Sequence, residues 1–82
     1  MNKPRQEKVT CPPGRSEDLS SIILKWYVNN GDIVKKGDAL LRLDSGDHFC
    51  EVEASIAGGV FGIIHSEGAN VQPNELLCVL KV

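Results

Sequence analysis

The side chains best able to do chemistry are concentrated in one short stretch, LRLDSGDHFCEVEA, at residues 41–54. Asp47, His48 and Cys50 are residue types that bind transition metals, and His65 would add a fourth ligand if the fold brought it near. The alternation of a strand argues against this site, because His48 and Cys50 would share one face while Asp47 would point to the other. We therefore favour a solvated hairpin turn with Cys50 in the core, and we keep a metal-binding hairpin as an alternative.

A nucleophilic pair of Cys50 and His48 is the other chemistry that this stretch suggests. The sequence offers no group for an oxyanion hole beside the pair, and so small a domain leaves little room for a deep pocket. No catalytic residue is predicted, no metal ligand is assigned, and the chain is not expected to be an enzyme.

The composition indicates a single small domain, since 82 residues provide for about one core. The net charge of −2 gives no cationic surface for nucleic acid or an anionic membrane, and no apolar run is long enough to span a bilayer. The three cysteines, at positions 11, 50 and 78, are widely spaced and form no CxxC motif. We expect reduced thiols, a cytoplasmic location, and neither nucleic acid nor membrane as a partner.

Alternating apolar residues and glycine turns predict strands, and no helix, along most of the chain. The polar residues 1–8 are predicted to be a flexible tail, with a short first strand at 9–11 and a single domain at 9–82. In SSIILKWYV one face is predicted to hold Ile22, Leu24, Trp26 and Val28. In ALLRL one face is predicted to hold Ala39, Leu41 and Leu43, with Leu40 and Arg42 opposite.

The stretch HFCEVEA is predicted to be a strand that turns its acidic side chains to solvent. Its inward residues would be Cys50, Val52 and Ala54, and its outward residues Phe49, Glu51 and Glu53. Trp26 and Tyr27 are interpreted as core and strand cover. An exposed apolar surface of Tyr27, Ile23 and Phe49, which would mark a partner site, is the alternative.

An internal repeat organises these strands. LKWYVNNGDIVKKGDALLRL, residues 24–43, superposes without a gap on FGIIHSEGANVQPNELLCVL, residues 61–80, at a constant shift of 37 residues. Each half reads as strand, glycine turn, connector and strand, and neither half alone would bury its apolar face. The two halves are therefore expected to wrap around a pseudo-twofold axis into one closed all-β domain, which also hides the strand edges.

These halves resemble the biotinyl/lipoyl attachment domain, the carrier of 2-oxoacid dehydrogenase complexes and biotin-dependent carboxylases. The resemblance covers about residues 20–82 and is carried by IILKWYVNNGDIVKKGDALLRLDS and EVEASIAGGVFGIIHSEGANVQPNELLCVL. It implies a flattened β-barrel or sandwich of two four-stranded antiparallel sheets. A hairpin would lie at one end and both termini at the other.

The resemblance also implies an attachment site at the hairpin tip, Asp44, Ser45, Gly46, Asp47 and His48. In that family an acidic residue is followed three positions later by the lysine that carries lipoate or biotin, and the pair EV comes seven positions after the acid. Here Asp44, Glu51 and Val52 keep this spacing, and Asp47 occupies the lysine position. A carboxylate cannot form the amide, which needs a primary amine, so no cofactor is expected.

The sequence therefore predicts an unmodified, non-catalytic relative of these carriers that serves as a structural or protein-docking module. Its expected partner is a protein, such as an acyltransferase or carboxylase assembly. A genuine lipoyl or biotin carrier that is modified at an unorthodox residue is the first alternative, and the metal-binding hairpin is the second.

Overall fold

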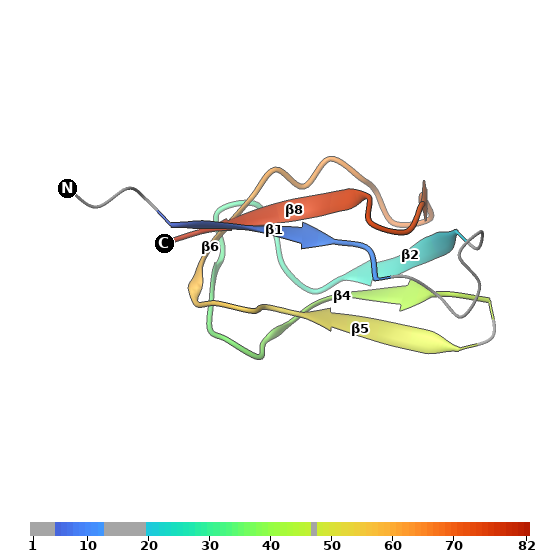
Figure 1. Ribbon diagram of the computed structural model, residues 1–82, viewed down its shortest axis with the longest axis horizontal. Helices are drawn as coiled ribbons and strands as arrows, with labels where there is room; N and C mark the ends of the chain where they lie inside the picture. The colour runs from blue at the N-terminus through green and yellow to red at the C-terminus, as the bar shows by residue number, and fades with distance from the viewer. Residues whose placement is uncertain (1–4, 13–19, 47) are drawn as a thin grey trace.

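A computed structural model of the chain describes residues 5–12, 20–46 and 48–82 and consists of β-strands and their connections. The strands are β1 (Gln6–Thr10), β2 (Ser21–Trp26), β3 (Ile33–Val34), β4 (Ala39–Asp44), β5 (Phe49–Glu53), β6 (Gly58–Phe61), β7 (Asn70–Val71) and β8 (Leu76–Lys81). They form two four-stranded antiparallel sheets (Figure 1). The β8 sheet has the order β1-β8-β6-β3, and the β4 sheet has the order β5-β4-β2-β7. The predicted all-β fold of two sheets is confirmed.

The sequence repeat appears in the structure as a pseudo-twofold relation between the sheets. β6, β7 and β8 begin 37 residues after β2, β3 and β4, and the order of each sheet maps onto that of the other. The cross-sheet hydrogen bonds repeat as well. Gly31 N–H donates to Val60 C=O at 2.7 Å, and Gly68 N–H donates to Ile23 C=O at the same distance. The strands β1 and β5 also correspond to each other, but their shift is 43 residues. It exceeds 37 because the connection between β1 and β2 is longer than the one between β5 and β6.

Tight turns related by the repeat connect the short strands to the long ones. Asp38 accepts a hydrogen bond from Lys35 N–H through its carboxylate at 2.8 Å, and Glu75 does the same for Gln72 N–H. Gly37 has a φ of 93°, and its repeat partner Asn74 has a φ of 68°. Asparagine is one of the few residues besides glycine that tolerate this left-handed conformation, so the turn is kept although the glycine is not.

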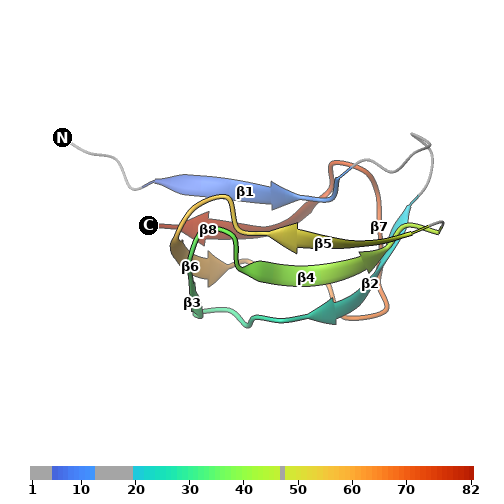
Figure 2. The same ribbon diagram turned by 90° about the horizontal axis from the view of Figure 1, so that it is seen from below.

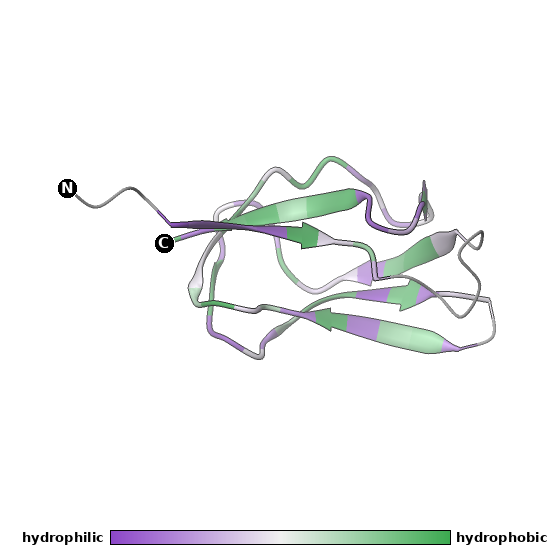
Figure 3. Cartoon of the chain, in the orientation of Figure 1, coloured by the Kyte–Doolittle hydropathy of each residue, from purple (hydrophilic) through white to green (hydrophobic). Residues whose placement is uncertain are grey.

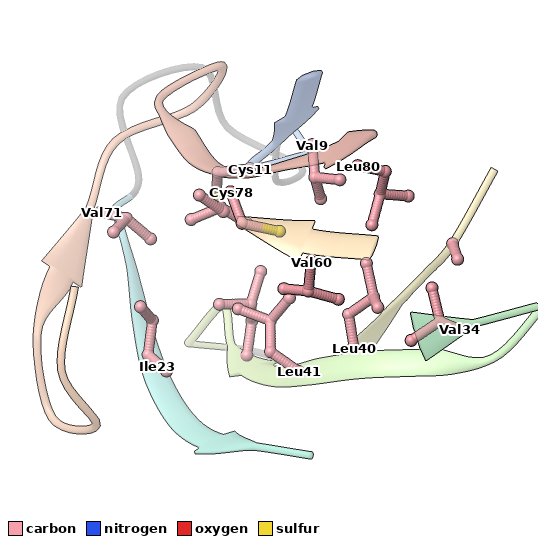
Figure 4. Close-up of a cluster of buried hydrophobic side chains, with 13 residues drawn as sticks. Val9, Cys11, Ile23, Val34, Leu40, Leu41, Val60, Val71, Cys78 and Leu80 are labelled. Carbon is pink, nitrogen blue, oxygen red and sulfur yellow. The ribbon is translucent and has the colours of Figure 1, made fainter. Parts of the chain in front are cut away.

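The core fills the space between the two sheets, and Figure 4 shows its side chains converging from both. Its largest fully buried members are Ile23, Leu40, Leu41, Leu43, Leu77, Leu80, Val60, Val71, Cys11 and Cys78. Figure 3 shows the same division along the strands, with apolar segments in β4 and β8 and polar segments in the connections. Trp26 is half-buried and packs against this core, as its interpretation as core predicted.

The start of the chain differs from the sequence prediction. β1 begins at Gln6, so residues 6–8, which were predicted to belong to a flexible tail, pair with β8 instead. Polar side chains do not prevent this pairing, because the ladder uses backbone groups and the outer face of an edge strand meets water. Residues 1–4 of the predicted tail lie outside the described residues.

Two β-bulges make the predicted faces of β2 and β4 wrong in part, although Trp26 and Val28 pack against the core and Leu41 and Leu43 are buried, as predicted. In β2 the register shifts between Ile23 and Lys25, so Ile23 is fully buried while Ile22 and Leu24 are exposed. The alternative prediction of an exposed apolar surface formed by Tyr27, Ile23 and Phe49 is therefore wrong for Ile23, which is buried. In β4 the extra residue is Leu40, which is buried and not opposite to Leu41 as predicted. A bulge adds one residue to one strand, and this breaks the strict alternation on which the prediction rested.

Candidate functional site

The hairpin between β4 and β5 lies at the end of the molecule opposite the chain termini (Figure 2). At the other end Val82 N–H donates to Arg5 C=O at 2.9 Å and joins the two terminal segments. The hairpin is closed by Ser45 N–H, which donates to His48 C=O at 3.0 Å. Two residues, Gly46 and the residue at position 47, therefore connect the closing pair of Ser45 and His48.

The local sequence explains the turn. Gly46 has a φ of 97°, a conformation that is strained for residues with a side chain, and its N–H donates to the Asp44 carboxylate at 2.9 Å. Asp44, the acidic residue of the predicted motif, thus holds the turn through a local side-chain to backbone bond. Gly46 and His48 are both exposed.

Ser45 anchors the tip to the body of the domain. Its side chain is buried, and its Oγ lies 3.3 Å from Oγ of Ser21 at the start of β2. A buried hydroxyl needs such a partner, because it has lost its bonds to water. This contact is not predictable from the residue pattern, since the two serines are 24 residues apart and only the folded register brings them together.

Beyond the tip, the outer face of the β4 sheet carries paired charges and exposed aromatic rings. Glu51 lies 3.7 Å from Arg42 and accepts a hydrogen bond of 2.7 Å from the Tyr27 hydroxyl. That bond to Glu51 raises the pKa of Tyr27 above its usual value. The guanidinium of Arg42 also lies over the Phe49 ring, 4.8 Å from its centroid. The predicted outward positions of Phe49 and Glu51 are confirmed.

Asp47, at the predicted attachment position, lies outside the described residues. The other four tip residues, Asp44, Ser45, Gly46 and His48, include no primary amine. The described residues at the tip therefore do not fit an amide-linked lipoyl or biotinyl group.

The lysines of the described chain lie on other parts of the fold. Lys35 and Lys36 belong to the turn between β3 and β4, beside the end of β5 that is remote from the tip. Lys25 is paired with Arg42 in the sheet, and its Nζ lies over the Tyr27 ring at 5.9 Å from the centroid. Lys8 and Lys81 lie on the β8 sheet.

His65, the fourth residue considered for metal binding, makes contacts with other residues of the domain. His65 Nε2 lies 3.1 Å from Glu75 Oε2, and the His65 carbonyl accepts a bond from the Trp26 indole N–H. Among the residues that the structure describes, no group of three or more His, Cys, Asp or Glu side chains is arranged to hold a metal ion. Asp47 is not among those residues, so the trio of Asp47, His48 and Cys50 is not tested.

The thiols are free, and two of them belong to the core. Cys11 and Cys78 are buried, whereas Cys50 on β5 is half-buried. Burial raises the pKa of Cys78 to about 11, and burial is also the main cause of the raised pKa of Cys11. Thiols held in the protonated form are poor nucleophiles, so neither buried cysteine is suited to covalent chemistry.

Comparison with known proteins identifies the fold. The lipoyl domain of the 2-oxoglutarate dehydrogenase complex from Azotobacter vinelandii superposes with a TM-score of 0.76 at 23% identity, covering 89% of this chain and 92% of that domain. The urea carboxylase of Kluyveromyces lactis superposes with a TM-score of 0.75 at 21% identity, over 98% of this chain and 6% of that one.

Sequence relatives point the same way. The succinyltransferase component of the 2-oxoglutarate dehydrogenase complex from Rickettsia bellii is 32% identical over 68 residues, which are 83% of this chain and 17% of the relative. The lipoamide acyltransferase component of the branched-chain alpha-keto acid dehydrogenase complex from Bacillus subtilis is 28% identical over 75 residues, 92% of this chain and 18% of the relative. The chain thus spans less than a fifth of the length of these relatives.

The barrel of two related sheets and its tip hairpin define a domain of the lipoyl and biotinyl carrier type. The family described as "Biotin-requiring enzyme" matches residues 8–80, and the chain belongs to this biotin/lipoyl family. It is related to the acyltransferases of 2-oxoacid dehydrogenase complexes. Among the described residues, no helix is long and apolar enough to cross a membrane.

Proposed function

We propose that this chain is an unmodified, non-catalytic member of the carrier family, which acts in the cytoplasm as a structural or protein-docking module. Its proposed place is beside an acyltransferase or carboxylase assembly, because its relatives are components of 2-oxoacid dehydrogenase complexes. No bound lipoate or biotin is part of this function.

The amino-acid sequence carries the proposal: the spacing from Asp44 to Glu51 aligns Asp47 with the attachment lysine of the family, and the chain has no lysine from residue 37 to residue 80. Both cofactors are attached through an amide to a primary amine. A carboxylate at that position supplies no nitrogen at any pH. The intact spacing from Asp44 to Glu51 supports the placement of Asp47, because a gap within the hairpin would have changed it.

The test is the intact mass of the chain after production together with active lipoate and biotin ligases. We expect the mass of the bare chain. A gain of one lipoyl or biotinyl group would contradict the proposal and support the alternative, a carrier modified at an unorthodox residue. Peptide mapping would then identify the modified lysine among positions 3, 8, 25, 35, 36 and 81.

Asp47→Lys and Lys36→Arg make the experiment sharper. If the tip has kept the shape that ligases recognise, Asp47→Lys gains a cofactor while the wild-type chain stays bare. Lys36→Arg removes an amine in a turn remote from the tip. In the wild-type chain and in Asp47→Lys alike, it is expected to leave the number of attached cofactors unchanged. Modification that disappears in Lys36→Arg would contradict the proposal.

A further inference from the structure

The outer face of the β8 sheet combines exposed apolar side chains with two lysines. In the ladder, Gly59 pairs with Ile33 on one side and with Lys81 on the other. In the next outward row, Val79 pairs with Phe61 and with Lys8. Their neighbours Val9, Val34, Val60 and Leu80 point into the core, so the six residues belong to the outward face of the sheet, where Gly59 itself is covered.

The apolar part of this face lies over Gly59. A Cβ atom at Gly59 would meet Cε2 of Phe61 at 2.9 Å and Cδ1 of Ile33 at 3.6 Å, so both side chains lean over the glycine. They remain accessible, with Ile33 81% and Phe61 42% exposed. The absence of a side chain at Gly59 thus gives a low, continuous apolar surface in the middle of the sheet.

The charged part of the face is cationic. Lys8 and Lys81 are diagonal neighbours across the β1–β8 ladder, and both are exposed. Lys81 Nζ lies 5.1 Å from the centroid of the Phe61 ring, so positive charge borders the apolar surface directly. Neither lysine forms an ion pair with any of the described residues. The only carboxylate on β1 is that of Glu7, which is opposite the buried Leu80 and so belongs to the other side of the strand.

The pseudo-twofold relation shows that this charge is not a property of the scaffold. The position in the β4 sheet that corresponds to Lys81, 37 residues earlier, is Asp44, and the position that corresponds to Lys8, 43 residues later, is Glu51. The same two places on the barrel therefore carry opposite charges on its two faces. Diagonal neighbours in a ladder are within reach of each other when their side chains are long, so the two ammonium groups repel each other and an external carboxylate would relieve this repulsion.

We propose that the outer face of the β8 sheet docks a protein segment that carries carboxylates next to an aromatic or aliphatic side chain. The apolar residue of the partner would cover Phe61 and Ile33, and its carboxylates would pair with Lys8 and Lys81. Two copies of this chain meeting at this face would bring four lysines together, so the charge argues against a symmetric dimer. This inference rests on the proposed docking function, for which it names the surface and the chemistry of the partner.

The test is a titration of the full ¹⁵N-labelled chain, followed by amide chemical shifts, with two synthetic probes. One peptide alternates Glu with Leu and Phe, and the other has Lys in place of each Glu. We expect the acidic peptide to shift the amides of Gly59, Phe61, Val79 and Lys81, more weakly as salt is added, and the basic peptide to shift none of them.

Charge-reversal variants decide which surface is responsible. Lys8→Glu with Lys81→Glu is expected to weaken binding of the acidic peptide by about tenfold or more. Lys25→Glu with Lys36→Glu changes the net charge equally at other places and is expected to bind like the wild type. Equal urea midpoints of the two double variants would verify that both are folded.

Three results would overturn the inference: no binding of the acidic peptide, shifts confined to the β4 sheet, or equal weakening in both double variants. Binding to phosphatidylserine vesicles in the absence of peptide binding would also overturn it, in favour of a lipid surface. The intact mass of each sample is measured in parallel. A cofactor found there would contradict the proposed function while leaving the peptide result to decide the docking surface.

Discussion

The pseudo-twofold relation makes a quantitative prediction about the core. Leu40 and Leu77 are separated by the repeat shift of 37 residues, each is the extra residue of a β-bulge, and each is fully buried. If the two halves of the domain are energetically equivalent, Leu40→Ala and Leu77→Ala must destabilise the domain by similar amounts.

The magnitude follows from burial. Each change removes three buried carbon atoms, which is about 2.4 kcal/mol of transfer free energy at ~0.8 kcal/mol per methylene. The remaining cavity adds to this, and leucine to alanine changes at fully buried sites cost about 2–5 kcal/mol. An 82-residue domain is expected to have a free energy of unfolding of about 4–12 kcal/mol. Either variant is therefore expected to lose a large part of its stability.

The assay is equilibrium unfolding in urea, followed by the fluorescence of Trp26, the only tryptophan, which packs against the core. Ile33→Ala, at an exposed side chain, is the control and is expected to stay within about 0.5 kcal/mol of the wild type. A cost below about 1 kcal/mol in one leucine variant and a large cost in the other would refute the equivalence of the two halves.

Three further predictions concern the turns and the thiols. Gly46→Ala is expected to cost about 1–2 kcal/mol in urea unfolding, because the φ of 97° is strained for alanine although nothing lies within 4 Å of the new Cβ. Gly46→Asn is expected to stay close to the wild type, because asparagine tolerates this conformation. A Gly46→Ala variant as stable as the wild type would contradict the argument. Asp38→Ala removes the acceptor for Lys35 N–H and is expected to cost about 0.5–1.5 kcal/mol in urea unfolding. Glu75→Ala removes the equivalent acceptor for Gln72 N–H and also the contact with His65, so it is expected to cost more. A lower urea midpoint in Asp38→Ala than in Glu75→Ala would contradict the assigned contacts. Burial raises the pKa of Cys78 from 9.0 to about 11, so the folded state holds its proton where the unfolded state releases it, and the resulting stability, present below pH 9, is lost as the pH rises towards 11. Urea midpoints between pH 8 and pH 11 are expected to fall less steeply in Cys78→Ala, with part of the slope left because the pKa of Cys11 is raised too, and an unchanged slope would contradict the burial argument.

The repeat was the most informative feature of the sequence, because it depends on spacing and not on any single strand. It predicted paired halves, and the structure places β3 with β7 and β4 with β8 at the predicted shift of 37 residues. The repeat even aligned Gly37 with Asn74, two residues that share a left-handed backbone. Turn residues carry this information locally, since their backbone conformation restricts which side chains are allowed.

The faces of the strands were less predictable for a physical reason. Leu40 and Leu41 both point into the core because a bulge interrupts the alternation, and nothing in the letters LLR marks the bulge. Gln6 to Lys8 joined a strand because β8 offered backbone partners, which is a property of the folded sheet and not of the segment itself. The Ser21–Ser45 contact that anchors the tip likewise depends on register.

The features that maintain this barrel are independent of the features that would make it a carrier. Glycine turns, paired bulges and a shared apolar core hold the two sheets together, and none of them requires an amine at position 47. Replacing a lysine at position 47 would therefore remove the cofactor without a cost in folding free energy. The domain would then keep only the binding properties of its surface. On that surface the pseudo-twofold relation fails at charged positions, with Lys8 opposed to Glu51 and Lys81 to Asp44. Asp44 and Glu51 have contacts within the domain, with Gly46 N–H and with Arg42 and Tyr27, whereas Lys8 and Lys81 form no ion pair with the described residues. Recognition of a partner is therefore the physical role that we infer for the two lysines.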